Sequence, residues 1–473
     1  MKAISQLLVL LITCLCTSCG SYHQSTKEFR KAWDMGDEVT ALAKIQAAGS
    51  SIKEGHDEEL LWNLEMLSMA RANEEDALAD FHLERASQLT EDQTSGLINP
   101  QNKGLGEYVG KYYDRNMLNV YKAIRALEQK DLNKVNSTLT AIKFQTVEAT
   151  KLNEKRNDDA EAKVAEEESL NMQKFKESGM VKTSDLLNEE LSSMYDPFYN
   201  PTGDYLRLVL DNRFNTDSAS DKSKLIQKGA FSAKNPKFLQ SEGKNATPAT
   251  YVFMETGSAP YRLEKKYRLP LIIFFNGNPP GGVLYVPFAI PQLQYREDHD
   301  SSAIVSAGST RLPLEQLVNM DAVVTAEFKA KLPAEIAKAM IQTTLAVLAQ
   351  VAIEAATKEQ AQDSAAIAIF SAIAKVAAAE AFTQADERGW YSLPKKILVQ
   401  KVPTPKDGRL TVSTASGQSV SVQVDSENKT NFVYLKSIRR ANTIKVLSNF
   451  GFADRIADLQ IGKLPTNILA SKN

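Results

Sequence analysis

Apolar residues in the first half of the chain recur every three or four positions, which is the spacing of helices that bury one face. This pattern predicts three antiparallel helical pairs between residue 28 and about residue 155, with turns at 35–37, 72–74 and 129–131. A further helical pair is expected between 198 and 235. We therefore predict a helical domain over residues 28–235.

The order of residues within these pairs is typical of tetratricopeptide-like repeats. Such a unit has a helix with Trp or Leu near its start, a short turn, and a helix with small Ala positions. Trp33 and Trp62, however, lie closer together than a unit of about 34 residues would place them. A helical bundle without a repeat is therefore the alternative to stacked helical hairpins.

Residues 153–182 differ from the rest of this half because they carry many charges and few apolar anchors. Such a segment is typical of a helix that projects into solvent, or of a flexible insertion within the helical domain. A solvated face is the simpler interpretation, and a binding arm is the alternative.

The second half of the chain contains short runs whose apolar residues alternate, which is typical of strands. The predicted strands lie at 250–255, 269–275, 283–288, 397–402, 409–414, 419–424, 431–435 and 443–447. Neither the earlier nor the later set is large enough for a stable sheet, so we expect 250–295 and 397–447 to share one core. This predicts a small β-sandwich or barrel over 249–450, followed by a C-terminal tail at 451–473.

Two Ala-rich helices, expected at 334–357 and 364–386, separate the two sets of strands and follow a helix at 314–329. Apolar residues occupy most sides of both, and such helices are normally buried. We expect a buried hairpin over 334–386; an amphipathic surface for a membrane or a partner is the alternative. The predicted class is therefore α+β, with tetratricopeptide-like helical hairpins followed by a β-sandwich or barrel that contains the Ala-rich hairpin.

Residues 1–18 have the parts of a lipoprotein signal peptide. Lys2 supplies a positive charge, 7–12 are apolar, and small residues come just before Cys19. The apolar run is far shorter than the ~20 residues that span a bilayer. We predict that a lipid is attached at Cys19 and that residues 19–27 form the lipidated tether. An ordinary signal peptide cleaved nearby is the alternative. Gly20 favours the outer membrane of a Gram-negative cell, with the folded part facing the periplasm.

Cysteine usage and net charge narrow the classes of function. The cysteines are Cys14, Cys16 and Cys19, so cleavage removes two and the lipid occupies the third. A mature chain without a free thiol excludes a cysteine nucleophile, a cysteine-based zinc site and an iron–sulfur cluster. The formal net charge of −2 does not favour a polyanion, so nucleic acid is not an expected partner.

Common catalytic motifs are missing from the sequence. It has no Gly-rich phosphate loop, no His-Glu-x-x-His motif and no Gly-x-Ser-x-Gly elbow. Residues 297–300 offer acids and an imidazole for a divalent cation, but contiguous residues do not converge easily. Glu255, with Arg262 and Glu264 nearby in sequence, is the other acidic candidate. The histidines are His23, His56, His82 and His299. We predict no catalytic, cofactor-binding or metal-binding residue.

Several short blocks carry a resemblance to a family of bacterial lipoproteins. They lie at 60–65, 116–123, 252–260, 286–291, 319–329 and 390–394. On these blocks the chain resembles the uncharacterised helical-repeat lipoproteins of the Gram-negative envelope, over most of residues 28–435. The chain departs from the family by lacking the Ala-Arg positions that usually follow the third helical turn.

The resemblance implies helical repeats followed by a β segment, and it supplies no catalytic residue because the family has none assigned. Genes of the family often lie beside those of small lipoproteins that activate penicillin-binding proteins, which implies a link to cell-wall assembly.

These observations leave three hypotheses for function. The leading one is a non-catalytic scaffold whose helical hairpins bind a protein partner of the envelope. The second is a structural or secretion-related envelope component that acts through the β half and the Ala-rich hairpin. The third is a hydrolase of an envelope polymer.

Overall fold

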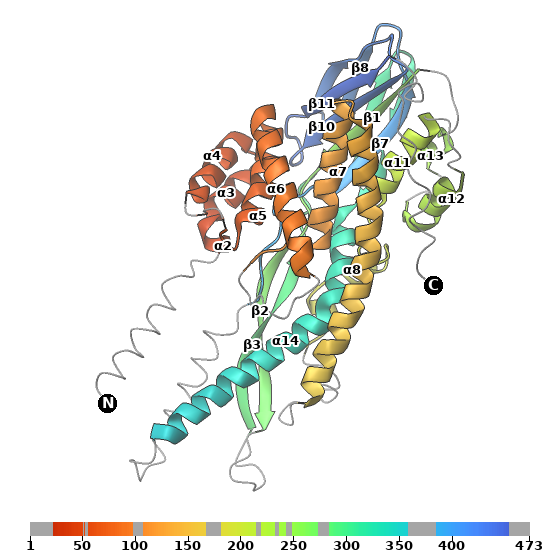
Figure 1. Cartoon of the computed structure of the whole chain (residues 1–473). Helices are drawn as coiled ribbons and strands as arrows, with labels where there is room; N and C mark the ends of the chain where they lie inside the picture. Colours follow the sequence, from red (N-terminus) through yellow and green to blue (C-terminus); the bar gives the residue numbers. More distant parts are fainter. Residues whose placement is uncertain are drawn as a thin grey trace.

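The computed structural model describes residues 22–50, 52, 55–97, 107–166, 181–213, 219–231, 236–242, 248–272, 283–357 and 385–453. Within these ranges, helices dominate the N-terminal half and strands the C-terminal half, which confirms the mixed α+β class (Figure 1). The signal peptide, Cys19 and the tail from residue 454 lie outside the described residues.

The N-terminal half begins with helices joined in pairs by short turns. They are α2 (Tyr22–Ser25), α3 (Lys27–Asp34), α4 (Glu38–Gly49), α5 (Glu59–Ala72), α6 (Asp76–Leu97), α7 (Tyr112–Glu128) and α8 (Leu132–Glu166). The predicted turns are confirmed, and each contains a residue with positive φ, namely Gly36, Glu74 and Lys130. This left-handed conformation is a common way to end a helix. The predicted tether is wrong in part, because residues 22–25 are helical and Tyr22 is buried.

The charged segment that begins at residue 153 is helical as far as the structure describes it. Helix α8 continues to Glu166, so a helix, one of the two expected forms of this segment, is present for that part, and 167–180 lie outside the described residues. One face of this part of α8 is not solvated. The amides of Asn153 and Asn157 donate hydrogen bonds of 2.9 and 3.0 Å to the carbonyl of Ala330 in α14 (Met320–Thr357).

A second group of helical elements lies between the hairpins and the strands. These elements are η2 (Thr183–Asp185), α10 (Glu189–Ser192), α11 (Pro201–Arg213), α12 (Ala219–Lys228) and α13 (Lys237–Gln240). The helical pair predicted between 198 and 235 corresponds to α11 and α12, which pack on each other.

Most strands of the described part of the chain belong to two open sheets, so the predicted closed barrel is wrong. The five-stranded sheet has the order β11-β10-β1-β7-β6, and the four-stranded sheet has the order β5-β4-β8-β9. Their bounds are β1 (Ala249–Thr256), β4 (Ala303–Ala307), β5 (Thr310–Pro313), β6 (Glu315–Asn319), β7 (Lys396–Pro403), β8 (Arg409–Thr414), β9 (Ser419–Gln423), β10 (Thr430–Ser437) and β11 (Lys445–Phe452).

Strand β1 joins the first of the earlier predicted strands to the later set. It pairs in parallel with β10 and antiparallel with β7, so the expected shared core is confirmed for residues 250–255. The strands predicted at 269–275 and 283–288 belong, as far as the structure describes them, to a separate two-stranded sheet. The side chains of β1 alternate between two apolar clusters, because successive strand residues point to opposite faces. Tyr251 and Phe253 belong to the cluster formed with the helices, whereas Val252 and Met254 pack with Val305 of the four-stranded sheet.

Helix α14 differs from the prediction at both of its expected boundaries. Residues 315–319 form strand β6 rather than the start of a helix, because they pair with β7. The helix then runs from Met320 to Thr357 with Pro333 inside it, instead of stopping before residue 334. Proline removes a backbone donor and disturbs the helix around it. The amides of Asn153 and Asn157 bind the nearby carbonyl of Ala330, so α8 supports α14 at this point.

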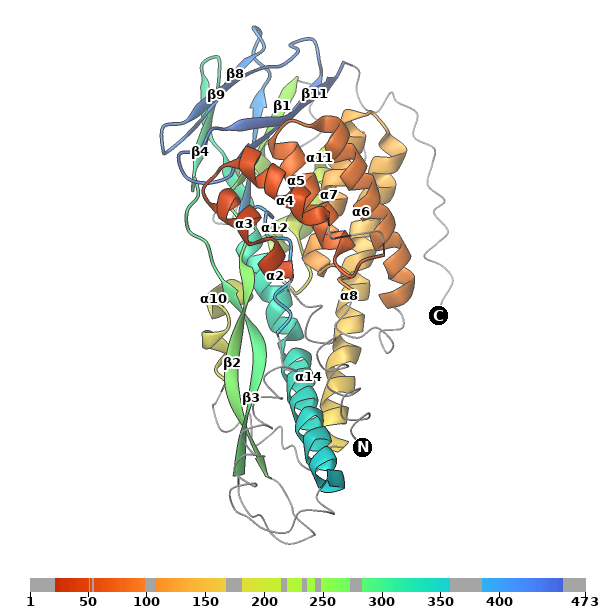
Figure 2. The ribbon, with the colours of Figure 1, turned by 90° about the vertical axis from the view of Figure 1, so that its left-hand side faces the viewer.

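The second halves of α14 and α8 and a long hairpin extend together beyond the other elements (Figures 1 and 2). The hairpin consists of β2 (Tyr261–Ile272) and β3 (Val283–Gln294). Both strands are longer than predicted, and β3 continues through Pro291. Ala337 and Met340 of α14 are buried as predicted. The side chain of Leu345 in α14 is not described, and residues 358–384, which include most of the second expected Ala-rich helix, lie outside the described residues. No helix of the described residues has the length and apolar character needed to cross a membrane.

Candidate functional site

The residues proposed for a cation site, 297–300, do not converge. Lys395 lies 3.4 Å from Glu297, Arg439 lies 2.8 Å from Asp298, and the hydroxyl of Ser437 donates to Asp300. The His299 ring bonds to the backbone carbonyl of Glu297. These contacts point the side chains toward different partners. No group of three potential metal ligands occurs among the residues that the structure describes.

Glu255 lies in the contact between the helical half and the five-stranded sheet. It is fully buried, and its carboxylate lies 2.7 Å from the Lys436 ammonium and 3.6 Å from the Arg71 guanidinium. Burial raises the pKa of Glu255, but these two cations outweigh it and hold the pKa below its ordinary value. The other predicted members of this site lie elsewhere, since Arg262 pairs with Glu335 and Glu264 with Lys266. Glu255 therefore joins α5, β1 and β10 and is not part of a catalytic cleft.

A cleft lies where α2, α3, the start of β2 and residues 387–391 meet. Its lining includes Tyr22, Arg30, Tyr113, Arg262 and Tyr391. The centre of a water-sized group can occupy about 30 Å³ of the cleft, and the empty space of the cleft together with its open mouth is about 500 Å³. A small group therefore fits inside the cleft, while a larger ligand would extend into its mouth.

Glu65 of α5 lines this cleft and holds residues 391–392 in place. Its carboxylate accepts hydrogen bonds from the backbone N–H groups of Tyr391 and Ser392 and from the Ser392 hydroxyl. Burial raises the pKa of Glu65 to about 7, although these donors oppose the shift. The sequence contains a signal for this residue, because Glu65 is a single acid within the apolar run at 60–67. Sequence reasoning did not use that signal.

Three arginines line the cleft, and two of them are paired with carboxylates. Arg262 is only 2% exposed, and its Nη1 donates to Glu335 at 3.1 Å. Arg388 donates to Asp386 at 2.9 Å. The Nη1 of Arg30 lies 2.7 Å from a ring nitrogen of His23. Burial is the main cause that lowers the pKa of His23 to about 4, and the charge of Arg30 adds to it. His23 is therefore neutral at neutral pH and can accept from Arg30.

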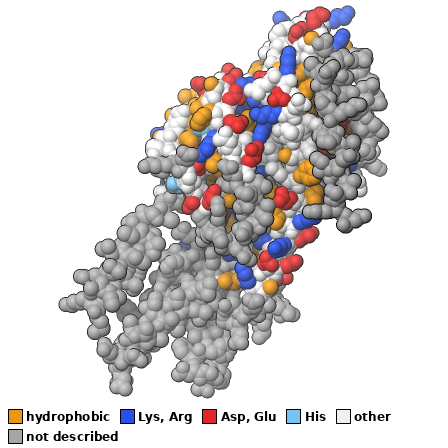
Figure 3. Space-filling view, in the orientation of Figure 1, with side chains coloured by type: hydrophobic (Ala, Val, Ile, Leu, Met, Phe, Trp, Pro, Cys, Tyr) orange, Lys and Arg blue, Asp and Glu red, His pale blue; other side chains and the backbone are white. Residues whose placement is uncertain are grey.

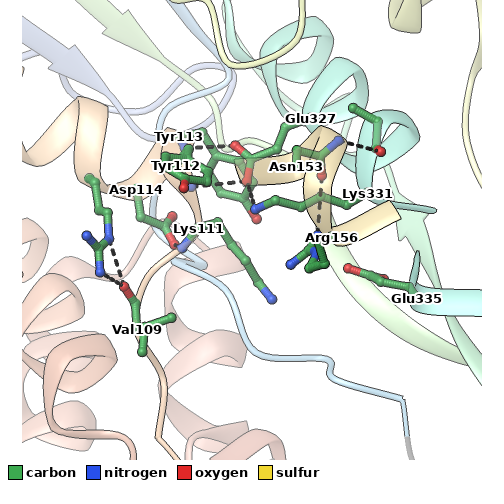
Figure 4. A network of polar contacts seen from close by, with 12 residues as sticks. Val109, Lys111, Tyr112, Tyr113, Asp114, Asn153, Arg156, Glu327, Lys331 and Glu335 are labelled. Carbon is green, nitrogen blue, oxygen red and sulfur yellow. Dashed lines mark hydrogen bonds and ion pairs between the residues drawn. The ribbon is translucent and has the colours of Figure 1, made fainter. Parts of the chain in front are cut away.

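A polar network next to the cleft fixes the start of α7 (Figure 4). Glu327 of α14 accepts hydrogen bonds from the backbone N–H groups of Tyr112 and Tyr113 at 3.0 and 2.9 Å. A carboxylate at a helix N-terminus satisfies free N–H groups and interacts favourably with the helix dipole. Lys331 pairs with Glu327, and burial lowers the pKa of Lys331 to about 8. This network positions Tyr113, which lines the cleft.

The other histidines have ordinary environments. His82 is buried on α6, and its Nδ1 lies 2.8 Å from the Asn63 side-chain oxygen, which fits the expected packing role. His56 lies in an exposed loop.

Comparisons with known proteins give no match to this chain, whether against family models, curated proteins or solved structures.

Proposed function

We propose that this chain is a lipoprotein of the Gram-negative envelope that acts as a non-catalytic protein-interaction scaffold. A lipid on Cys19 anchors it to the outer membrane, and the folded part faces the periplasm. Its helical hairpins form a tetratricopeptide-like partner-binding half, and its two sheets form a small sandwich. The apolar cluster of Val252, Val305 and Leu410 from both sheets supports the sandwich.

The position of the exposed apolar side chains carries the proposal. Among the described residues, the large apolar side chains that remain exposed lie on the helical hairpins. They are Met35, Val39, Phe81, Phe144 and Val147. Phe81 and Phe144 are 64% and 59% exposed. Full burial of a Phe side chain stabilises a protein or a complex by about 1.5–3 kcal/mol, so a partner that covers these rings gains affinity.

Two of these side chains form a small continuous patch. Phe144 and Val147 are three residues apart on α8 and therefore lie on the same side of the helix. Hydrophobic side chains also appear between charged ones over the helical region in Figure 3. An apolar patch with a charged rim is typical of a protein-binding surface.

The buried charges support a non-catalytic role. Glu255, Glu327 and Asp321 pair with Lys436, Lys331 and Lys395, respectively. Each pair joins separate parts of the fold or stabilises α14. These carboxylates are therefore committed to structural contacts.

The extension formed by the second halves of α8 and α14 and by the β2–β3 hairpin favours a second candidate, a structural or secretion-related envelope component (Figure 2). In that case the partner would bind the extension instead of the helical hairpins.

Site-specific photocrosslinking distinguishes the two surfaces. We would place a photoreactive amino acid at Phe81 or Phe144 in the full chain, with Arg409 and Ser419 as exposed control positions in the sheets. The scaffold proposal predicts a discrete adduct from the helical positions and none from the controls. Further probes at the exposed residues Lys338 of α14 and Lys266 of β2 test the extension, and adducts that form only from these two positions would support the second candidate and contradict the first.

A further inference from the structure

Several donors of the cleft have no hydrogen-bond partner among the described residues. They are the Tyr22 hydroxyl, the Nε of Arg30, and the Nε and Nη2 of Arg262. The Tyr113 phenol lies beside the Arg262 guanidinium and interacts with it, without meeting the geometry of a hydrogen bond to its Nε or Nη2. Buried polar groups are normally paired, and an unpaired one lowers stability. Tyr22, Arg30 and Arg262 therefore each present a donor without an acceptor, and all three line the same cleft.

The unpaired atoms of Arg262 form one complete edge of its guanidinium group. The Nη1 atom binds Glu335, whereas Nε and Nη2 belong to the edge that has no partner. Two parallel N–H groups on such an edge match the two oxygens of a carboxylate or phosphate. Arg262 is held by Glu335 and packs over the Phe328 ring, with its guanidinium carbon 5.0 Å from the ring centroid. The edge is therefore preorganised.

The charges and volume of the cleft select between these two anions. Arg30, Arg262 and Arg388 line the cleft, but Glu335 and Asp386 already pair with Arg262 and Arg388. Glu65 and Glu387 line the cleft as well, so a dianionic phosphate would lie beside several acids without enough cations to balance it, whereas a carboxylate brings a single charge. The space of about 30 Å³ that is open to the centre of a water-sized group admits only a small group, so the rest of the ligand must lie in the mouth beside Tyr261 and Tyr391. A monoanion on an organic group fits these conditions.

We propose that the cleft binds a carboxylate, with the Nε–Nη2 edge of Arg262 as a bidentate donor and Tyr22 and Arg30 as further donors. The carboxylate belongs either to the C-terminus of a peptide or to a free organic acid. The peptide source rests on the proposed scaffold function, because the peptide would be part of the protein partner. The free acid does not depend on that function.

The binding test uses the full-length protein and three probes. They are a fluorescent hexapeptide with a free C-terminal leucine, the same peptide with an amidated C-terminus, and sodium benzoate as a competitor. We expect saturable binding of the free-acid peptide and at least about tenfold weaker binding of its amide, as for a lost hydrogen-bonded charge. Benzoate that binds while the peptide does not would assign the site to small acids. No saturable binding of either acid would overturn the proposal.

Variants connect the binding to the unpaired donors. Tyr22→Phe removes a hydroxyl that has no partner in the free protein, so it should weaken acid binding several-fold without lowering the melting temperature. Tyr267→Phe is the matched control, because the Tyr267 hydroxyl is also unpaired but does not line the cleft. Arg262→Lys keeps the charge but loses the bidentate edge, and we expect about a tenfold loss.

The Tyr22 and Arg30 variants keep the proposal testable if Arg262→Lys does not fold. Acid binding that Tyr22→Phe and Arg30→Gln leave unchanged would overturn the assignment of these donors. Binding that Tyr267→Phe weakens equally would also contradict it. A failure of carboxylate binding would leave the photocrosslinks from Phe81 and Phe144 unaffected, so the two proposals fail separately.

Discussion

The substitution Glu255→Gln should destabilise the junction between the helical half and the five-stranded sheet. Glu255 is fully buried, lies 2.7 Å from Lys436 and 3.6 Å from Arg71, and accepts a hydrogen bond of 2.9 Å from the Tyr434 hydroxyl. Glutamine has nearly the same volume but no charge, so the variant leaves the buried Lys436 and the half-buried Arg71 without this counterion. Removing one partner of a buried pair costs about 3–5 kcal/mol. We expect a loss of stability in that range.

Urea denaturation followed by tryptophan fluorescence and circular dichroism measures this loss. Trp33 is a useful reporter because the Lys436 ammonium lies 5.4 Å from the centroid of its ring. The matched control is Glu91→Gln, which makes the same chemical change in the exposed Lys122–Glu91 pair. An exposed pair contributes about 0–1 kcal/mol, so the control should unfold almost like the wild type.

The pH dependence gives an independent check on the same residue. Since the folded pKa of Glu255 is below its ordinary value of 4.5, its contribution to stability is present above pH 4.5 and is lost as the pH falls through the folded pKa. The gap between wild type and Glu255→Gln should therefore narrow in acid. A variant that unfolds like the Glu91→Gln control at neutral pH would refute the reasoning.

Three further predictions follow from the sequence and the fold. Cys19→Ser should leave the membrane fraction or remain unprocessed, and palmitate labelling that persists on this variant would contradict lipid attachment there. The fragment 388–473 should not melt cooperatively by calorimetry, because it lacks strand β1 that lies between β7 and β10; a sharp transition would show independent folding. Glu65 has a folded pKa of about 7 against an ordinary 4.5, so its contribution is fully present below pH 4.5 and is lost as the pH rises through 7. Glu65→Gln should flatten the melting temperature between pH 5 and 8, and an unchanged slope would contradict this assignment.

The sequence predicts elements well where local signals are sufficient. The turns at 35–37, 72–74 and 129–131 are confirmed because the apolar spacing stops there and short polar residues follow. Strand β1 was predicted because its run of β-branched and aromatic residues favours a strand in any context.

The prediction failed where a distant segment decides the local structure. Residues 315–319 become a strand through pairing with β7, about eighty residues later in the chain. Helix α14 continues through Pro333 with support from the amides of Asn153 and Asn157 on α8. Neither partner can be identified from the local pattern.

The candidate site shows the same limit. Arg262 is close to Glu255 in sequence, but adjacent strands and helices place it against Glu335 of α14 instead. Glu65 could have been chosen as a buried acid from its apolar neighbours, whereas its partners at 391–392 lie in a distant segment. Residue types therefore indicate which groups are buried, and only the fold indicates which groups meet.

The most direct test of the scaffold is the amount of partner complex that forms when the exposed rings are removed. Phe81→Ser combined with Phe144→Ser would be compared with Arg409→Ser combined with Ser419→Ala, after crosslinking in intact cells. The account predicts that complex formation falls several-fold only in the first variant, while both keep the wild-type melting temperature. Undiminished complex formation in the first variant, or an equal loss in the second, would contradict the role of the helical hairpins as the partner-binding surface.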